Sequence, residues 1–87
     1  MPDVVIDANY EVRWREPVWV RIGQGVPESI KGPKQALSYL TFRWPELEGD
    51  HVQQALQQCR RVLRKEAECD VARAAFVRAA REANVIL

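Results

Sequence analysis

Residues 70–83 read DVARAAFVRAAREA, a run in which alanines recur every three or four positions around one large apolar residue, Phe76. That spacing places the apolar residues on one face of a helix and the arginines on the other. Small side chains allow a second helix to approach closely. The pattern therefore predicts a helix that Asp70 caps and that buries its alanine face in the core.

The pair Gly32-Pro33 is expected to open an earlier helix, because Pro33 suits the first helical position. It should end near Trp44, because Pro45 disfavours helical geometry in the residue before it. Its inner face is formed by apolar residues at helical spacing, which are Ala36, Leu37, Leu40 and Trp44.

A middle helix is predicted from His51 to about Glu66, with Asp50 as its cap. Its apolar residues form one stripe, and glutamines and basic residues surround the other side. We expect Leu56 of this stripe to meet Phe76 inside the domain. The stripe consists of Val52, Ala55, Leu56, Cys59, Val62 and Leu63.

Alternation of apolar and polar residues indicates strands in the N-terminal half. The clearest pattern predicts an antiparallel hairpin of Val18–Ile22 with Val26–Ile30, joined by a glycine-containing turn. Pro27 cannot donate to a ladder, which assigns the second strand to an edge. A weaker alternation runs from Tyr10 to Trp14, and residues 1–9 are either flexible or an edge strand that includes Val4-Val5-Ile6.

Together these elements predict one α+β domain over residues 1–87. A small antiparallel sheet of two or three strands is covered on one face by three helices, in the order β-β-α-α-α. The apolar end of the chain, Val85-Ile86-Leu87, is expected to fold back onto the sheet or onto a partner.

Composition excludes several protein classes. The chain has 87 residues, of which 47% are hydrophobic and 29% charged, with a net charge of +1. This composition is typical of a folded domain. A net charge this small does not by itself indicate binding to nucleic acid or to a membrane surface. No apolar segment approaches the roughly 18 residues that a membrane span needs. Two cysteines are too few for a disulfide scaffold, so we expect reduced thiols and a cytoplasmic location.

The residues that could carry catalysis are few. His51 is the only histidine, and at a helix start a neutral imidazole could serve as a base or simply lie at the surface. Cys59 belongs to the apolar stripe, whereas Cys69 lies at a helix start where the dipole could activate its thiol. The acids on either side of Cys69 oppose that effect. No metal site, cofactor site or catalytic set is predicted, and we expect a protein that is not an enzyme.

The leading functional hypothesis is a non-enzymatic protein-interaction module. Trp19 points opposite to Val18 and Val20, so it should lie on the outer face of the sheet beside Arg21. An exposed tryptophan beside a sheet edge is a plausible contact point for a protein partner. A homodimer formed through the sheet edge and Trp19 is one form of this hypothesis.

The alternative is a weak nucleic-acid-binding protein. Residues 51–87 carry seven basic and four acidic residues, a net charge of +3. If the last two helices pack together, their arginines could form one surface that meets phosphates. The competing interpretation is an ordinary solvated face. The candidate phosphate-binding residues are Arg60, Arg61, Arg64, Arg73, Arg78 and Arg81.

From Trp14 onward the chain resembles a bacterial family known as domain of unknown function 982. The resemblance rests on Pro17-Val18, Ala36, Leu40, Trp44-Pro45, Gly49, Ala55, Cys59 and the motif Ala72-Arg73-x-Ala75-Phe76-x-x-Ala79-Ala80-x-x-Ala83. It implies a small free-standing protein without an assigned reaction, cofactor or substrate. Within the motif Arg73 lies in a first helical turn, where a cation is unfavourable. We therefore expect Arg73 to bond carbonyls or stack on Trp44 in the loop from Trp44 to Gly49.

Overall fold

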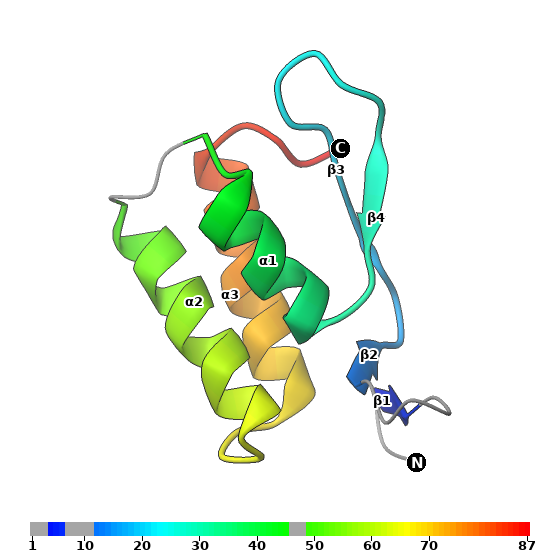
Figure 1. The fold of residues 1–87 in the computed structure, drawn as a ribbon, viewed down its shortest axis with the longest axis vertical. Coiled ribbons are helices and arrows are strands. Elements are labelled where there is room, and N and C mark those ends of the chain that lie inside the picture. Colours follow the sequence, from blue (N-terminus) through cyan, green and yellow to red (C-terminus); the bar gives the residue numbers. More distant parts are fainter. Residues whose placement is uncertain (1–3, 7–11, 46–48) are drawn as a thin grey trace.

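Four short strands precede three helices in the chain. A computed structural model describes residues 4–6, 12–45 and 49–87. The elements are β1 (Val4–Ile6), β2 (Val12–Trp14), β3 (Val18–Val20), β4 (Glu28–Ile30), α1 (Pro33–Phe42), α2 (Asp50–Leu63) and α3 (Cys69–Glu82). The strands lie together on one side of the helices (Figure 1). The predicted α+β class is confirmed.

The strands form two antiparallel pairs, where a single sheet of two or three strands was expected. β3 pairs with β4 so that Val18 lies opposite Ile30, which confirms the predicted hairpin with shorter strands. β1 pairs with β2, with Val4 opposite Trp14, so the N-terminal apolar run is a strand. The part of the weaker alternation at Tyr10 lies outside the described residues.

Residues 85–87 pair with β3 through an isolated bridge. After α3, Asn84 adopts a left-handed φ of 58°, and the Val85 N–H donates to the Ala80 carbonyl at 3.0 Å. This is a Schellman ending, which reverses the chain direction. The Arg21 N–H then donates to the Val85 carbonyl at 2.7 Å, and Ile86 bridges to Val20. Residues 85–87 therefore fold back onto β3, which confirms one of the two expected positions.

Two predicted helix caps are wrong, Asp50 by one residue and Asp70 by two. α2 begins at Asp50 with Gly49 as its N-cap, and α3 begins at Cys69 with Glu68 as its N-cap. Asp50 and Asp70 lie in the first turns and make no side-chain capping bond. A carboxylate is favourable there because it interacts with the positive end of the helix dipole. Since Asp is also a preferred N-cap residue, the sequence does not distinguish the two positions.

The end of α2 also comes earlier than expected. The helix ends at Leu63, and Lys65 follows with a left-handed φ of 62°. The Glu66 N–H donates to the Arg61 carbonyl at 2.8 Å, which completes a second Schellman ending. A lysine in this conformation carries a steric cost that glycine would avoid.

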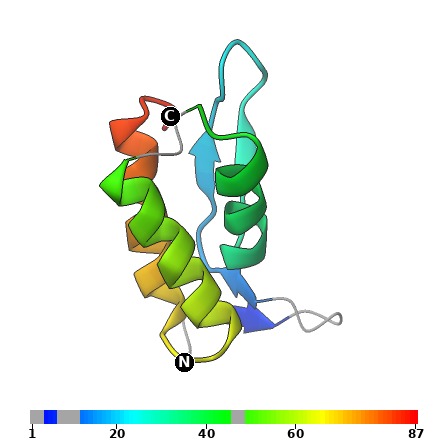
Figure 2. The ribbon, with the colours of Figure 1, turned by 60° about the vertical axis from the view of Figure 1, so that its left-hand side comes forward.

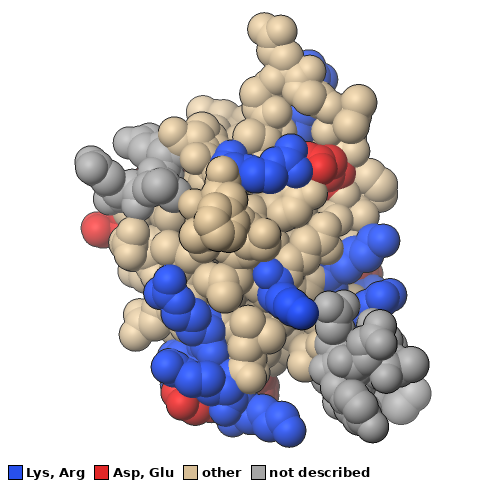
Figure 3. Space-filling view, in the orientation of Figure 1, with Lys and Arg blue, Asp and Glu red and all other residues tan. Residues whose placement is uncertain are grey.

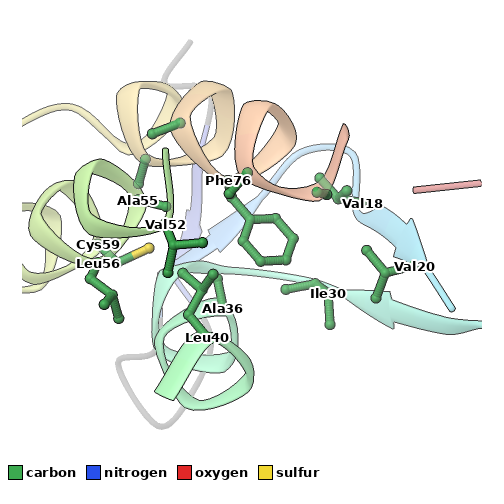
Figure 4. Close-up of a cluster of buried hydrophobic side chains, with 14 of the residues drawn as sticks. Val18, Val20, Ile30, Ala36, Leu40, Val52, Ala55, Leu56, Cys59 and Phe76 are labelled. Atoms are coloured by element: carbon green, nitrogen blue, oxygen red, sulfur yellow. The ribbon is translucent and has the colours of Figure 1, made fainter. Parts of the chain in front are cut away.

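Phe76 lies at the centre of the core, as predicted. Its side chain is completely buried between the helices and the strands (Figure 4). The indole rings of Trp14 and Trp44 contact it, with ring centroids at 5.8 and 5.4 Å. Leu56 is also buried, so its predicted place in the core is confirmed.

Close backbone contact joins the strands to the start of α1. Gly32 is buried, and a Cβ atom added there would lie 2.3 Å from the Val12 carbonyl oxygen. Next to it the Trp14 N–H donates to the Lys31 carbonyl at 2.7 Å. Position 32 therefore excludes any side chain, because β2 passes directly against the backbone where α1 begins.

Candidate functional site

A groove runs beside α3, between this helix and the strands. Arg73, Val77 and Arg81 are spaced four residues apart, so they form one stripe along the helix. β3 lies beside α3, as the turned view shows (Figure 2). The groove has a volume of about 260 Å³ and is lined by Pro17, Val18, Trp19, Arg73, Val77, Arg81, Ile86 and Leu87. Residues from both ends of the sequence thus form one site.

The apolar part of the groove includes two large exposed side chains, Trp19 and Leu87. Val18 and Val20 are buried, and Trp19 between them is 50% exposed, as the alternation predicted. Leu87 follows the bridge at Ile86 and is 65% exposed, and its N–H donates to the Trp19 carbonyl at 3.1 Å. Adjacent exposed apolar side chains of this size are characteristic of binding surfaces.

The charged part of the groove is positive. None of the described residues that line it is acidic, whereas Arg73 and Arg81 both contribute guanidinium groups. The Arg73 Nε–H donates to the Glu16 carbonyl at 2.9 Å, which holds this side chain at the groove. Arg81 has no carboxylate within salt-bridge distance among residues 12–45 and 49–87. The groove therefore offers two cations beside an apolar surface.

The expected partner of Arg73 is corrected in one respect. It bonds a carbonyl, as predicted, but the carbonyl belongs to Glu16 and not to the loop from Trp44 to Gly49. The reason is geometric. Trp44 lies against the side of α3 that carries Ala79, whereas Arg73 lies on the side facing β3.

The remaining arginines do not line the groove. Arg61 donates to the Gln58 side chain at 3.3 Å, and Arg64 pairs with Glu66 at 3.3 Å. Figure 3 shows basic side chains over the lower end of α2 with acidic side chains among them. Of the six candidate phosphate-binding arginines, only Arg73 and Arg81 lie in the groove, while Arg60, Arg61, Arg64 and Arg78 lie elsewhere. Arg21 also lies outside it, at the end of β3.

The groups considered for catalysis are either buried or in contact with a charged neighbour. Burial raises the pKa of the Cys59 thiol to about 12, and burial together with Asp70 raises the pKa of Cys69 to about 11. Both thiols are therefore protonated near neutral pH. His51 contacts the Glu82 carboxylate through Nδ1, which joins the start of α2 to the end of α3. The described ranges contain no cluster of three or more metal-ligating side chains.

A larger hollow of about 370 Å³ lies between β2 and the start of α1. Its basic lining residues include Arg13 and Lys34, and each of these already takes part in a contact of its own. The groove beside α3 is the stronger candidate, because its large apolar side chains and Arg81 are available to a ligand.

Sequence alone had identified Trp19, Arg73 and Arg81, but in two separate hypotheses. The structure brings these three residues together. Val77, Ile86 and Leu87 were missed as site residues. The spacing of four between Arg73, Val77 and Arg81 was the available signal, although it did not reveal which element this stripe faces.

Comparison with known proteins places the groove within a matched region. The family model described as protein of unknown function (DUF982) matches residues 16–87. The NMR structure of the Agrobacterium tumefaciens protein Atu1219, a structural genomics target, is similar with a TM-score of 0.72 and 34% sequence identity. The similarity covers 86% of this chain and 75% of that one. Among curated proteins there is no match. No described helix has the length and apolarity that crossing a membrane requires.

Proposed function

This chain belongs to the DUF982 family of proteins of unknown function, and from that premise we propose that it is a non-enzymatic protein-interaction module. It binds an acidic segment of a partner protein in the groove beside α3. The observation that carries the proposal is the juxtaposition of exposed Trp19 with Arg73 and Arg81, without an acid among the described lining residues. Tryptophan and arginine are the residues most enriched at binding hot spots.

The groove can supply a useful part of a binding free energy. A tryptophan presents up to about 250 Å², and half of the Trp19 side chain is still exposed. Covering that half removes roughly 125 Å² from water, which corresponds to about 3 kcal/mol at 25 cal/mol per Å². Carboxylates that reach Arg73 and Arg81 add charge-assisted hydrogen bonds. Ordering costs offset part of this gain, so we expect micromolar affinity.

An acidic partner fits the groove better than a second copy of the chain does. In a two-fold dimer the same surface patch meets itself. Arg73 and Arg81 would then approach their own counterparts, and like charges across an interface are unfavourable. Self-association through Trp19 is therefore the less favoured form of the interaction hypothesis.

Protein side chains also fit the lining better than nucleic-acid bases do. Single-stranded nucleic acid binds where several aromatic rings stack on successive bases along a basic track. Here Trp19 is the one aromatic residue among the described lining residues, and its neighbours Val77, Ile86 and Leu87 are aliphatic. Aliphatic walls suit apolar side chains of a peptide.

Selection from a display library of random decapeptides tests the proposal. We expect the full chain to enrich sequences rich in Asp and Glu that also contain apolar residues. Trp19→Ala or Arg81→Glu should abolish this enrichment. Phe42→Ala and Arg78→Glu are matched controls, because they change an exposed aromatic residue and an exposed arginine outside the groove. Thermal melts confirm that each variant is folded.

Four results would overturn the proposal. The selected peptides could lack acidic residues, or they could bind the Trp19→Ala variant as well as the native chain. Light scattering could instead show a dimer that Trp19→Ala dissociates, which would assign the groove to self-association. Tight binding of oligo-dT that weakens steeply with salt and requires Arg73 and Arg81 would support the nucleic-acid alternative.

A further inference from the structure

The β3–β4 pair together with the bridged residues 85–87 has two outer edges, and one of them is closed. The Gln35 side chain of α1 lies along the outer edge of β4. Its Nε2 donates to the Ser29 carbonyl at 3.0 Å, and its Oε1 accepts from the Lys31 N–H at 3.0 Å. Next along this edge, the Lys31 carbonyl accepts from the Trp14 N–H at 2.7 Å. These bonds occupy main-chain groups to which another strand would pair.

At the opposite edge, formed by residues 85–87, no strand of the described part of the chain pairs on the outer side. The bonds from Arg21 N–H to the Val85 carbonyl and from Leu87 N–H to the Trp19 carbonyl flank the bridge between Val20 and Ile86. In such an antiparallel pair the N–H and C=O of the central residue point away from the neighbouring strand. The main chain of Ile86 makes no hydrogen bond within the described part of the chain.

This edge borders the groove, since Ile86 and Leu87 line it. We propose that the partner segment binds as an extended strand that pairs with the main chain of Ile86 and so extends the sheet. This inference rests on the proposed function. Strand addition supplies affinity through main-chain bonds, whereas the side-chain pockets supply specificity.

The stripe on α3 sets the spacing of side chains on that strand. Arg81 lies eight positions after Arg73 on the helix, which is about 12 Å along the axis. An extended chain covers this distance in about four residues, at about 3.3 Å each. Residues i, i+2 and i+4 share one face of a strand. The segment therefore carries acidic residues four positions apart, with an apolar residue midway that meets Val77.

A labelled peptide with the core Glu-Thr-Val-Thr-Glu tests this inference by fluorescence anisotropy with the full chain. A control peptide with the same composition and the core Glu-Glu-Val-Thr-Thr tests the spacing of the two glutamates. We expect the first peptide to bind at least tenfold more tightly. Equal affinities would overturn the predicted spacing.

N-methylation of the peptide backbone tests strand pairing without altering the protein. A strand presents alternate N–H groups to one neighbour. The N–H of the central valine and the N–H groups of its two flanking threonines therefore point in opposite directions. Methylating one of these two sets should weaken binding at least tenfold, and methylating the other set should not. Equal effects of the two modifications would overturn strand addition. On the protein side, Ile86→Pro removes the N–H at an edge position where proline is tolerated, and Ile86→Val is its control.

The two proposals fail in distinguishable ways. If the display library yields acidic peptides that depend on Trp19 and Arg81 but tolerate every N-methylation and Ile86→Pro, the groove binds peptides and strand addition is wrong. If the library yields no acidic peptides, the proposed function itself is wrong. Loss of binding that follows the alternation of the peptide backbone supports both.

Discussion

Replacing Phe76 with alanine is expected to remove a large share of the stability of this domain. The side chain is completely buried, and Phe→Ala changes in cores cost about 3–5 kcal/mol. Its tilted contacts with Trp14 and Trp44, at 5.8 and 5.4 Å, place it toward the upper end of that range. A chain of this length has about 4–13 kcal/mol of total stability, at 0.05–0.15 kcal/mol per residue. Phe76→Ala should therefore cost about 4–5 kcal/mol, which is between roughly a third of that stability and all of it.

Phe42 provides the matched control, because it is the other phenylalanine of the chain and is 82% exposed. Phe42→Ala should change the free energy of unfolding by less than about 0.5 kcal/mol. Urea unfolding followed by far-UV circular dichroism and tryptophan fluorescence measures both variants. A cost below about 1.5 kcal/mol for Phe76→Ala, or equal costs for the two variants, would refute the central place given to Phe76 in the core.

Three further predictions concern backbone strain, pH and thiol reactivity. Lys65→Gly should raise the free energy of unfolding by about 0.5–1 kcal/mol, because glycine adopts the left-handed φ of 62° without steric cost; a lower melting temperature would contradict this. The Arg43 guanidinium holds the pKa of Glu28 below its usual value of 4.5, so this pair stabilises the fold above that pH and the benefit is lost as the solution is acidified. Urea unfolding across the acid range should show a weaker pH dependence for Glu28→Gln, and parallel curves would argue against the pairing. Cys59 and Cys69 should resist a thiol reagent at neutral pH until urea is added, because both are buried and protonated; rapid modification of the folded protein would disprove that.

Most of the secondary structure follows from local patterns in the sequence. Helical spacing around Phe76 and Leu56 and alternation around Trp19 predicted elements that the structure contains. The errors lie at helix ends, where Asp50 and Asp70 occupy first turns without capping. A carboxylate is favourable both as a cap and inside the first turn, so its identity alone does not locate the helix start.

The candidate site could be predicted only in pieces. Alternation placed Trp19 on the outer face of the sheet, and helical spacing placed Arg73 away from the alanine face of its helix. Their meeting in one groove depends on how α3 packs beside β3 and on the return of residues 85–87 to the sheet. No local pattern carries that information, since it concerns residues far apart in the chain.

The sequence alone specified the helices and strands of this protein through the spacing of apolar residues. Side chains of a helix or a strand repeat at intervals that depend on backbone geometry alone. Which edge of the sheet is closed and which residues line the groove depend on the tertiary structure alone. Gln35 closes one edge of the sheet, while Ile86 lies at the other edge beside Arg81. Such contacts form only when distant segments bury apolar area together. The arrangement of those segments depends on the close packing of all core side chains, not on any one stretch of sequence.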